Sequence, residues 1–230
     1  MEKETPSPNL SADIFTVLKN RIIHWEYLPD HRFTEIGLSE EFGVSRSPIR
    51  EVLQMLEENG LVVKEPRQGY VVRQPGLPEV YEFYEFRMAL ELYLVECLAE
   101  KGMDPLLWQK IHDQWQSYQS NVPNLDEDMS VQDESFHESL AEAAGNSLLF
   151  QKLKEVNERL HFIRANDITT PERLMLTCQQ HLSILQAIKN QDAQAARKAI
   201  KENINEGRQN VDHAIKEALA KAYLKTRSND

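Results

Sequence analysis

The run Glu35–Arg50 constrains this chain more than any other segment. Its residues predict a short helix, a tight turn at Gly43 and a second helix that opens on Ser45. Along the second helix, apolar side chains recur at the i, i+3, i+4 and i+7 spacing of one buried face: Ile49, Val52, Leu53 and Leu56. Arg46 and Arg50 fall on the opposite side. The segment therefore predicts a helix-turn-helix, a motif whose second helix enters the major groove of DNA.

Two strand-prone runs follow the second helix. Leu61–Glu65 and Tyr70–Arg73 are rich in valine and flank the turn-forming residues 66–69. They predict a two-stranded wing with Arg67 and Gly69 at its tip. A glycine at that place would let the backbone approach a phosphate or the minor groove closely.

The start of the second helix carries the main candidates for contact with DNA. Arg46 and Arg50 lie one turn apart, and an arginine there can fork onto O6 and N7 of guanine. Ser45 and Ser47 flank a helix N-terminus, which favours a phosphate. The alternative is a protein-interaction module in which Ser45 is only an N-cap. In that interpretation the arginines pair with nearby acids: Glu41, Glu51 or Glu57.

Composition excludes several other classes. A net charge of −11 over 230 residues argues against a protein that coats nucleic acid nonspecifically, so any DNA contact must be local. The two cysteines, Cys97 and Cys178, form no Cys-x-x-Cys pair, and no secretory segment opens the chain. No apolar run approaches the roughly 18 residues of a membrane span. We therefore expect a cytoplasmic protein that does not enter a membrane.

Proline and glycine divide the chain into regions of different pattern. Residues 1–10 are polar and contain two prolines, and they predict a flexible tail; Ser11 is the expected N-cap of the first helix. A winged helix-turn-helix domain is expected over 11–74. A linker over 75–78, which holds two prolines and a glycine, leads to a helical domain over 79–226.

The second domain shows only helical periodicity. Six helices are expected, at about 78–101, 105–119, 127–144, 147–166, 171–190 and 192–224. The expected fold class is therefore mainly α: an N-terminal winged helix-turn-helix with a two-stranded wing, followed by a C-terminal all-α six-helix bundle.

Four polar side chains fall on helical stripes that are otherwise apolar. Asp133 and His137 lie one turn apart on one expected helix, and His181 and Asn203 lie on two later ones. Burying such groups without partners is unfavourable by a few kcal/mol each, so they must pair with one another, with water or with a ligand. A carboxylate and imidazoles that converge suit a first-row metal ion. The alternative is a set of satisfied core or surface residues.

Two arginines also lie on inward stripes of the expected bundle. An arginine that faces a core is unfavourable unless it meets an anion. Arg87 and Arg164, the latter on one stripe with Asn157, therefore predict an anionic partner in the interior, and these three residues are the candidates for contact with an effector. The alternative is a structural salt bridge to one of three acids: Glu91, Glu138 or Asp133.

The run 38–62, which starts Leu-Ser-Glu-Glu-Phe-Gly-Val-Ser-Arg-Ser-Pro-Ile-Arg, and the run 67–72, Arg-Gln-Gly-Tyr-Val-Val, closely resemble the winged helix of GntR-family bacterial transcription regulators. The resemblance implies DNA contacts at five positions: Ser45, Arg46, Ser47, Arg50 and Gly69. Two residues depart from the pattern. Asp30 replaces the glycine that usually follows the proline, and Ile36 stands where some members carry another DNA-contacting arginine. Affinity or operator preference is expected to differ for that reason.

Residues 78–226 resemble the FCD-type effector domain. Its Asp-x-x-x-His signature is Asp133–His137, its Glu-His-x-x-Ile motif appears as Gln180–Ile184, and its last histidine aligns with Asn203. The resemblance implies a bound divalent metal, zinc or nickel. An amide oxygen is a poorer ligand than imidazole for these metals. Three protein ligands plus the effector then complete the coordination sphere, or the metal binds weakly, or it does not bind.

The sequence thus predicts a homodimeric, ligand-responsive transcription regulator, more often a repressor than an activator, that binds a short palindrome. The resemblance implies that Arg87 helps to line a pocket for a small carboxylated metabolite. The main alternative is a metal-dependent enzyme built on Asp133, His137 and His181, although the chain lacks a His-Glu-x-x-His motif. A structural interaction protein is the other alternative.

Overall fold

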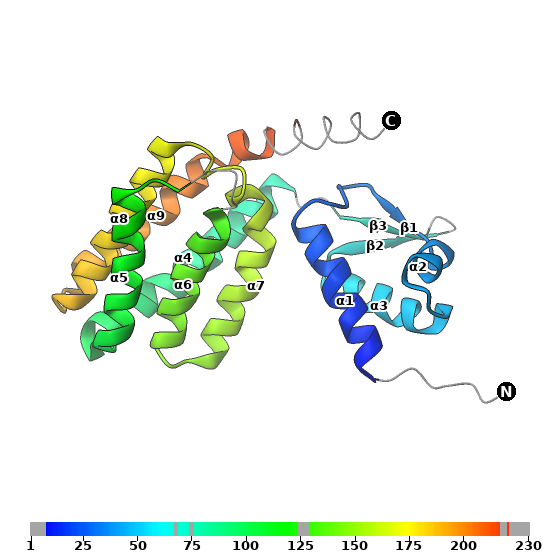
Figure 1. The fold of residues 1–230 in the computed structure, drawn as a ribbon, viewed down its shortest axis with the longest axis horizontal. Helices are drawn as coiled ribbons and strands as arrows, with labels where there is room; N and C mark the ends of the chain where they lie inside the picture. The colour runs from blue at the N-terminus through cyan, green and yellow to red at the C-terminus, as the bar shows by residue number, and fades with distance from the viewer. Residues whose placement is uncertain (1–7, 67–68, 74–75, 124–128, 217–219, 221–230) are drawn as a thin grey trace. The chain divides into compact units, whose positions relative to one another are not determined.

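The computed structural model describes residues 8–66, 69–73, 76–123, 129–216 and 220. The chain divides into two compact units, Met1–Gly76 and Leu77–Asp230 (Figure 1). Both units are dominated by helices. The only sheet among the described residues belongs to the first unit.

The first unit combines three helices with three short strands within its described residues. The helices are α1 (Pro8–Ile23), α2 (Glu35–Phe42) and α3 (Arg46–Glu58), and the strands are β1 (Arg32–Phe33), β2 (Val62–Glu65) and β3 (Gly69–Val72). Helix α1 begins before the expected N-cap Ser11, because proline is well tolerated in a first helical turn. Residues 8–10 therefore belong to α1 and not to the expected tail, whereas residues 1–7 lie outside the described residues.

The helix-turn-helix forms where the sequence predicts it. Thr34 caps α2 by accepting a hydrogen bond from the Gly37 N–H at 3.0 Å. Gly43 ends that helix in the left-handed region, with φ of 65°, a conformation that favours glycine. Ser45 precedes α3 with an extended backbone, but its hydroxyl makes no capping hydrogen bond. The Ser45 side chain is thus not used as an N-cap.

The apolar face of α3 builds the core of the first unit. Its four members are fully buried: Ile49, Val52, Leu53 and Leu56. They join one cluster with Leu18 of α1, Phe33 of β1, and Val62 and Tyr70 of the sheet. Burial of a leucine or isoleucine of this kind contributes about 1.5–3 kcal/mol relative to an exposed position. This packing fixes which side of α3 faces solvent.

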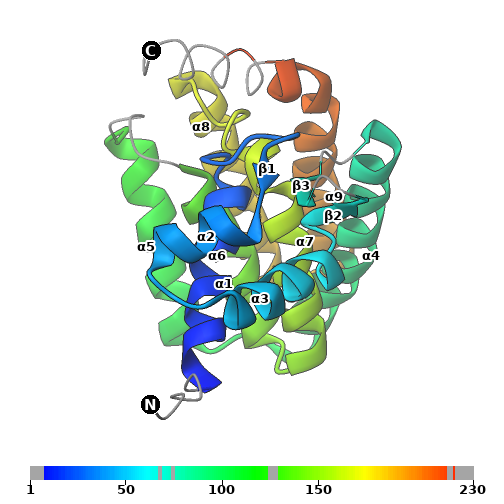
Figure 2. The ribbon, with the colours of Figure 1, turned by 90° about the vertical axis from the view of Figure 1, so that its right-hand side faces the viewer.

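The sheet has one strand more than the sequence indicated. Its order is β1-β3-β2, and both pairings are antiparallel (Figure 2). Strands β2 and β3 form the expected wing, with Val63 opposite Val71. Strand β1 adds to the other edge of β3, with Phe33 opposite Tyr70. A strand of two residues is too short to show an alternating pattern, so no sequence signal marked it.

The described residues of the second unit form six long helices, and the first five match the expected ones closely. The six are α4 (Leu77–Lys101), α5 (Pro105–Ser120), α6 (Met129–Ala143), α7 (Ser147–Arg164), α8 (Pro171–Lys189) and α9 (Ala193–Gln209). The starts are well signalled because Asp104, Asn146, Thr170 and Asp192 each cap a helix through the side chain. The last helix differs from the expected 192–224, since α9 ends at a turn at Asn210 and residues 211–216 are helical again.

Helix α4 lies at the centre of this bundle. It packs against α6, α7, α8 and α9, and α5 covers α8 (Figure 1). Side chains from α4, α6, α7 and α8 therefore meet in one interior. Within the described part of the chain, no helix is long and apolar enough to span a membrane.

Candidate functional site

The exposed side of α3 presents the expected DNA-reading residues. Ser45, Arg46, Ser47 and Arg50 are exposed, whereas Ile49 between them is fully buried. Arg46 forms no ion pair with any described residue. Arg50 is 64% exposed, but its Nε lies 2.8 Å from Oε2 of Glu35 on α2. The helix therefore offers two guanidinium groups on one face, one of them held by an acid that the sequence did not single out.

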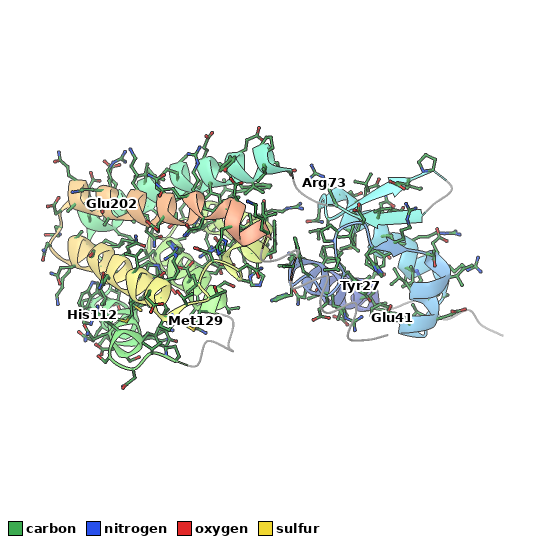
Figure 3. All side chains as sticks on the ribbon, turned by 90° about the horizontal axis from the view of Figure 1, so that it is seen from above. Tyr27, Glu41, Arg73, His112, Met129 and Glu202 are labelled. Atoms are coloured by element: carbon green, nitrogen blue, oxygen red, sulfur yellow. The ribbon has the colours of Figure 1, made fainter. Side chains whose placement is uncertain are left out.

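The three acids named in the alternative interpretation all have other partners. Glu41 accepts hydrogen bonds from Arg21 at 2.5 Å and from the Tyr27 hydroxyl at 3.1 Å (Figure 3). Glu51 accepts a hydrogen bond from the Ser11 hydroxyl at 2.7 Å. Glu57 lies 3.4 Å from the backbone nitrogen of Lys64. None of these contacts involves the two arginines, so this alternative loses its proposed pairing.

The glycine of the wing has a structural reason to be there. Gly69 has φ of 86°, and a Cβ at this position would lie 2.5 Å from the carbonyl oxygen of Phe33. The close approach to β1 therefore requires glycine, independently of any contact with DNA. The wing-tip candidate Arg67 lies outside the described residues.

The second unit brings Asp133, His137 and His181 together in its interior. Their potential ligand atoms all lie within 4.8 Å of one another, and all three residues are buried. Oδ1 of Asp133 is 3.1 Å from Nε2 of His181 and 3.7 Å from Nε2 of His137. This cluster joins α6 to α8, as the stripe pattern predicted.

Glu91 on α4 orients one of these imidazoles. The Nδ1–H of His137 donates to Oε2 of Glu91 at 2.5 Å, and both side chains are almost completely buried. When the imidazole is neutral, this bond places the proton on Nδ1 and the lone pair on Nε2, which is the atom nearer Asp133. Burial raises the pKa of Glu91, but His137 and Arg87 outweigh burial and lower it to about 2. Glu91 is therefore an ionised acceptor.

The imidazole of His181 lies against two aromatic rings. His181 stacks on Phe136, with ring centroids 3.7 Å apart, and meets the edge of Trp115 at 4.1 Å. Its Nδ1 is buried without a hydrogen-bond partner among the described residues, and its Nε2 lies 3.1 Å from Oδ1 of Asp133 without the geometry of a hydrogen bond. Burial lowers the pKa of His181 to about 4, although Asp133 acts in the opposite direction. A buried neutral imidazole with unused nitrogens is the form that binds a metal ion.

Arg164 connects the same carboxylate to the predicted effector residues. Its Nε donates to Oδ2 of Asp133 at 3.0 Å, its Nη2 also donates to Oδ2, and its Nη1 donates to Oδ1 of Asn157 at 2.7 Å. The Asn157 amide in turn donates to Glu138 at 3.0 Å. Burial raises the pKa of Asp133, but Arg164 and the two histidines together hold it well below its usual range.

Arg87 completes the network from the α4 side. Its Nε donates to Oε1 of Glu91 at 2.6 Å, and the side chain is 4% exposed. Its Nη2 is buried without a hydrogen-bond partner among the described residues. Arg87 thus forms a salt bridge with Glu91, and Arg164 forms one with Asp133. These are the structural salt bridges that the sequence analysis gave as the alternative. One donor of Arg87 remains available for a ligand.

Asn203, the fourth candidate ligand, has a different partner. It is buried on α9, and its amide donates to Oε1 of Gln180 at 3.0 Å. The sequence missed the role of Glu91 as the partner of His137, although the inward position of Glu91 beside Leu90 and Leu94 was a usable signal. A second pair, buried His161 with partly buried Glu134 at 3.0 Å, was also not anticipated.

A winged helix-turn-helix followed by a separate helical domain defines a class of protein, the two-domain DNA-binding regulators. Residues 10–72 match the family of bacterial regulatory proteins called gntR, and residues 82–206 match the FCD domain. The chain therefore belongs to the GntR family and is a DNA-binding transcriptional regulator of the FCD type.

Individual relatives agree with this assignment. The uncharacterised regulator YdhC of Bacillus subtilis is 28% identical over 94% of this chain and 96% of its own length. The transcriptional repressor RspR of Escherichia coli K12 is 26% identical over 87% of this chain and 88% of its own. The fold is also similar to that of a solved structure from Rhodococcus, described as a putative GntR transcriptional regulator, with a TM-score of 0.72 at 20% identity over 90% of this chain and 99% of that chain.

Proposed function

We propose that this regulator binds a palindromic operator as a homodimer, acts as a repressor, and responds to a small carboxylated metabolite that binds beside a divalent metal ion. The observation that carries the sensing half of the proposal is the buried cluster of Asp133, His137 and His181. Repression is supported by RspR, a relative that is named a transcriptional repressor and that matches this chain over most of the length of both proteins.

The dimer is supported by the charge of the chain. A net charge of −11 cannot supply broad attraction for DNA, so affinity must come from specific contacts. One recognition helix reads only a few bases, and two helices related by a two-fold axis read two half-sites of a palindrome. Arg46 and Arg50 are the residues that we expect to read guanine, and Ser45, Ser47, Arg67 and Gly69 are expected to contact phosphates or the minor groove.

The cluster fits a divalent ion. One carboxylate oxygen of Asp133 and the Nε2 atoms of His137 and His181 would hold it, and the unsatisfied ring nitrogens of His181 support this choice. Zinc and nickel both accept such a donor set. The ion would supply a Lewis-acidic anchor for a carboxylate group. Asn203, which now donates to Gln180, is the expected additional ligand.

Charge balance couples the metal to an anion. With neutral imidazoles, the positive charges of Arg87 and Arg164 balance the negative charges of Glu91 and Asp133. A divalent ion would add two positive charges to this interior, and an organic acid would offset them. The free Nη2 of Arg87 and the amide of Asn157 are the expected contacts for that acid.

The test begins with metal analysis of full-length protein purified without added metal or chelator. The same measurement on His137→Ala should show loss of the metal, whereas His112→Ala, on α5 and outside the cluster (Figure 3), should retain it. Organic acids are then screened for a metal-dependent rise in melting temperature. A mobility-shift assay with DNA upstream of the gene should lose its complex when the stabilising acid is added. Equal metal content in all three proteins would contradict the proposed ligands.

The alternative of a metal-dependent enzyme gains no support from the geometry. A hydrolytic site needs a carboxylate or imidazole free to act as general base. The acids near the cluster are engaged: Glu91 with His137 and Arg87, Glu138 with Asn157, and Glu134 with His161.

A further inference from the structure

The ion pair between Arg50 and Glu35 joins the second turn of α3 to the first residue of α2. It uses only the Nε of the guanidinium, at 2.8 Å, and leaves the arginine 64% and the glutamate 33% exposed. No residue in the described part of the chain hydrogen-bonds the two Nη groups of Arg50. The pair therefore restrains the guanidinium through Nε and leaves its two Nη groups free.

Two simpler roles for Glu35 do not account for this pairing. An exposed ion pair contributes little to stability. Glu35 also follows the N-cap Thr34, where an acidic residue favours the helix dipole. The dipole effect explains why an acid suits the start of α2. It does not explain why that acid reaches an arginine 15 residues away on the exposed edge of α3.

The geometry matches the needs of base recognition. An arginine reads guanine by directing two parallel N–H groups at O6 and N7. Its long side chain loses much rotamer freedom when it is fixed, and fixing it before binding reduces that loss. Glu35 accepts a hydrogen bond from Nε of Arg50, and both Nη groups therefore stay free to contact a base together. Arg46, by contrast, has no such acid beside it among the described residues.

We propose that Glu35 is a positioning residue for sequence recognition, which holds Arg50 so that its two Nη groups meet guanine. The inference rests on the proposed role of Arg50 in reading DNA. It also gives Glu35 a second, opposite effect. A negative charge close to the duplex weakens the attraction of the protein for phosphates of any sequence. Glu35 thus raises discrimination and lowers nonspecific affinity.

The test compares four full-length proteins with the wild type: Glu35→Gln, Arg50→Ala, the double variant, and the control Glu40→Gln. Glu40 is another exposed acid on α2, and it pairs with no described residue, so its variant removes the same charge from the same helix. The DNA is a duplex selected in vitro from random sequence with the wild-type protein. Matched duplexes replace each guanine in turn, and a scrambled duplex reports nonspecific binding.

We expect Arg50→Ala to lose the preference for one guanine, and Glu35→Gln to weaken that same preference by about two- to tenfold. Adding Glu35→Gln to Arg50→Ala should change it no further. Binding to scrambled DNA should tighten in both Glu35→Gln and Glu40→Gln, while Glu40→Gln keeps the wild-type guanine preference. A role in helix stability alone would change the melting temperature without changing which base is preferred. If Glu35→Gln melts lower, Glu35→Ser, which suits a helix start, serves as the second variant.

Three results would overturn the inference. If Arg50→Ala loses the guanine preference and Glu35→Gln keeps it, the positioning role is wrong and the DNA-reading role of Arg50 stands. If Glu35→Gln and Glu40→Gln weaken the preference equally, the effect is only one of charge. If Arg50→Ala keeps the preference, the reading role of Arg50 is wrong, and the role of Glu35 is wrong with it.

Discussion

Nδ1 of His137 lies 2.5 Å from Oε2 of Glu91, and this single contact ties the candidate metal ligands on α6 to the central helix α4. The same glutamate accepts a hydrogen bond from Arg87 through its other oxygen at 2.6 Å. Glu91 therefore stands between the expected metal ligand and the expected effector contact. A movement of α4 on effector binding would therefore shift His137, and metal binding at His137 would in turn affect the position of α4.

The first prediction concerns this contact. Glu91→Gln should weaken metal binding by about 10- to 100-fold, because loss of an outer partner leaves the ligand imidazole poorly oriented and less basic. Isothermal titration of metal-free protein with zinc measures the change. Glu96→Gln, at a partly exposed position of the same helix where the acid pairs with Arg197, provides the control. Wild-type affinity in Glu91→Gln would exclude this orienting role.

The second prediction concerns the buried pair of Arg164 and Asp133. Removal of one partner leaves an uncompensated buried charge, so Arg164→Ala should destabilise the second unit by about 3–5 kcal/mol. The double variant Asp133→Asn, Arg164→Met should recover part of that loss, because it removes both charges. Urea unfolding followed by circular dichroism measures both. Equal destabilisation in the single and double variants would contradict a direct pairing.

The third prediction concerns the wing. Gly69→Ala should destabilise the sheet, because its Cβ would meet the Phe33 carbonyl at 2.5 Å in a backbone with positive φ. Such backbone strain is of the order of 1–3 kcal/mol. Gly145→Ala is a matched control, since Gly145 also has positive φ but open space around its Cβ position. A larger fall in melting temperature for Gly145→Ala than for Gly69→Ala would show that the contact with β1 is unimportant.

The fourth prediction concerns Asn203. If this residue lies at an open metal position, Asn203→His should tighten zinc binding, because imidazole is a better ligand than an amide oxygen. Titration of metal-free protein compares the variant with the wild type. Gln180→Ala, which removes the present partner of Asn203, should leave the affinity of Asn203→His unchanged. No gain in affinity would place Asn203 outside the coordination sphere.

Local sequence patterns were sufficient for most of the fold. The helix-turn-helix was predictable because Gly43 and the stripe Ile49, Val52, Leu53 and Leu56 carry their information within a few residues. The helices of the second unit were predictable for the same reason, since capping residues and prolines mark their starts. The third strand was not predictable, because Arg32–Phe33 becomes a strand only when β3 lies beside it.

The sequence by itself determined that Asp133 and His137 leave one face of one helix, since their spacing of four residues follows from helix geometry alone. It could not determine that His137 pairs with Glu91, which is 46 residues away. It also could not determine that Arg50 of α3 pairs with Glu35 of α2. Partners of this kind are chosen by the packing of helices, which depends on the whole core. Helical periodicity is a local property of the chain, whereas the pairing of buried and exposed charges is a property of its tertiary structure.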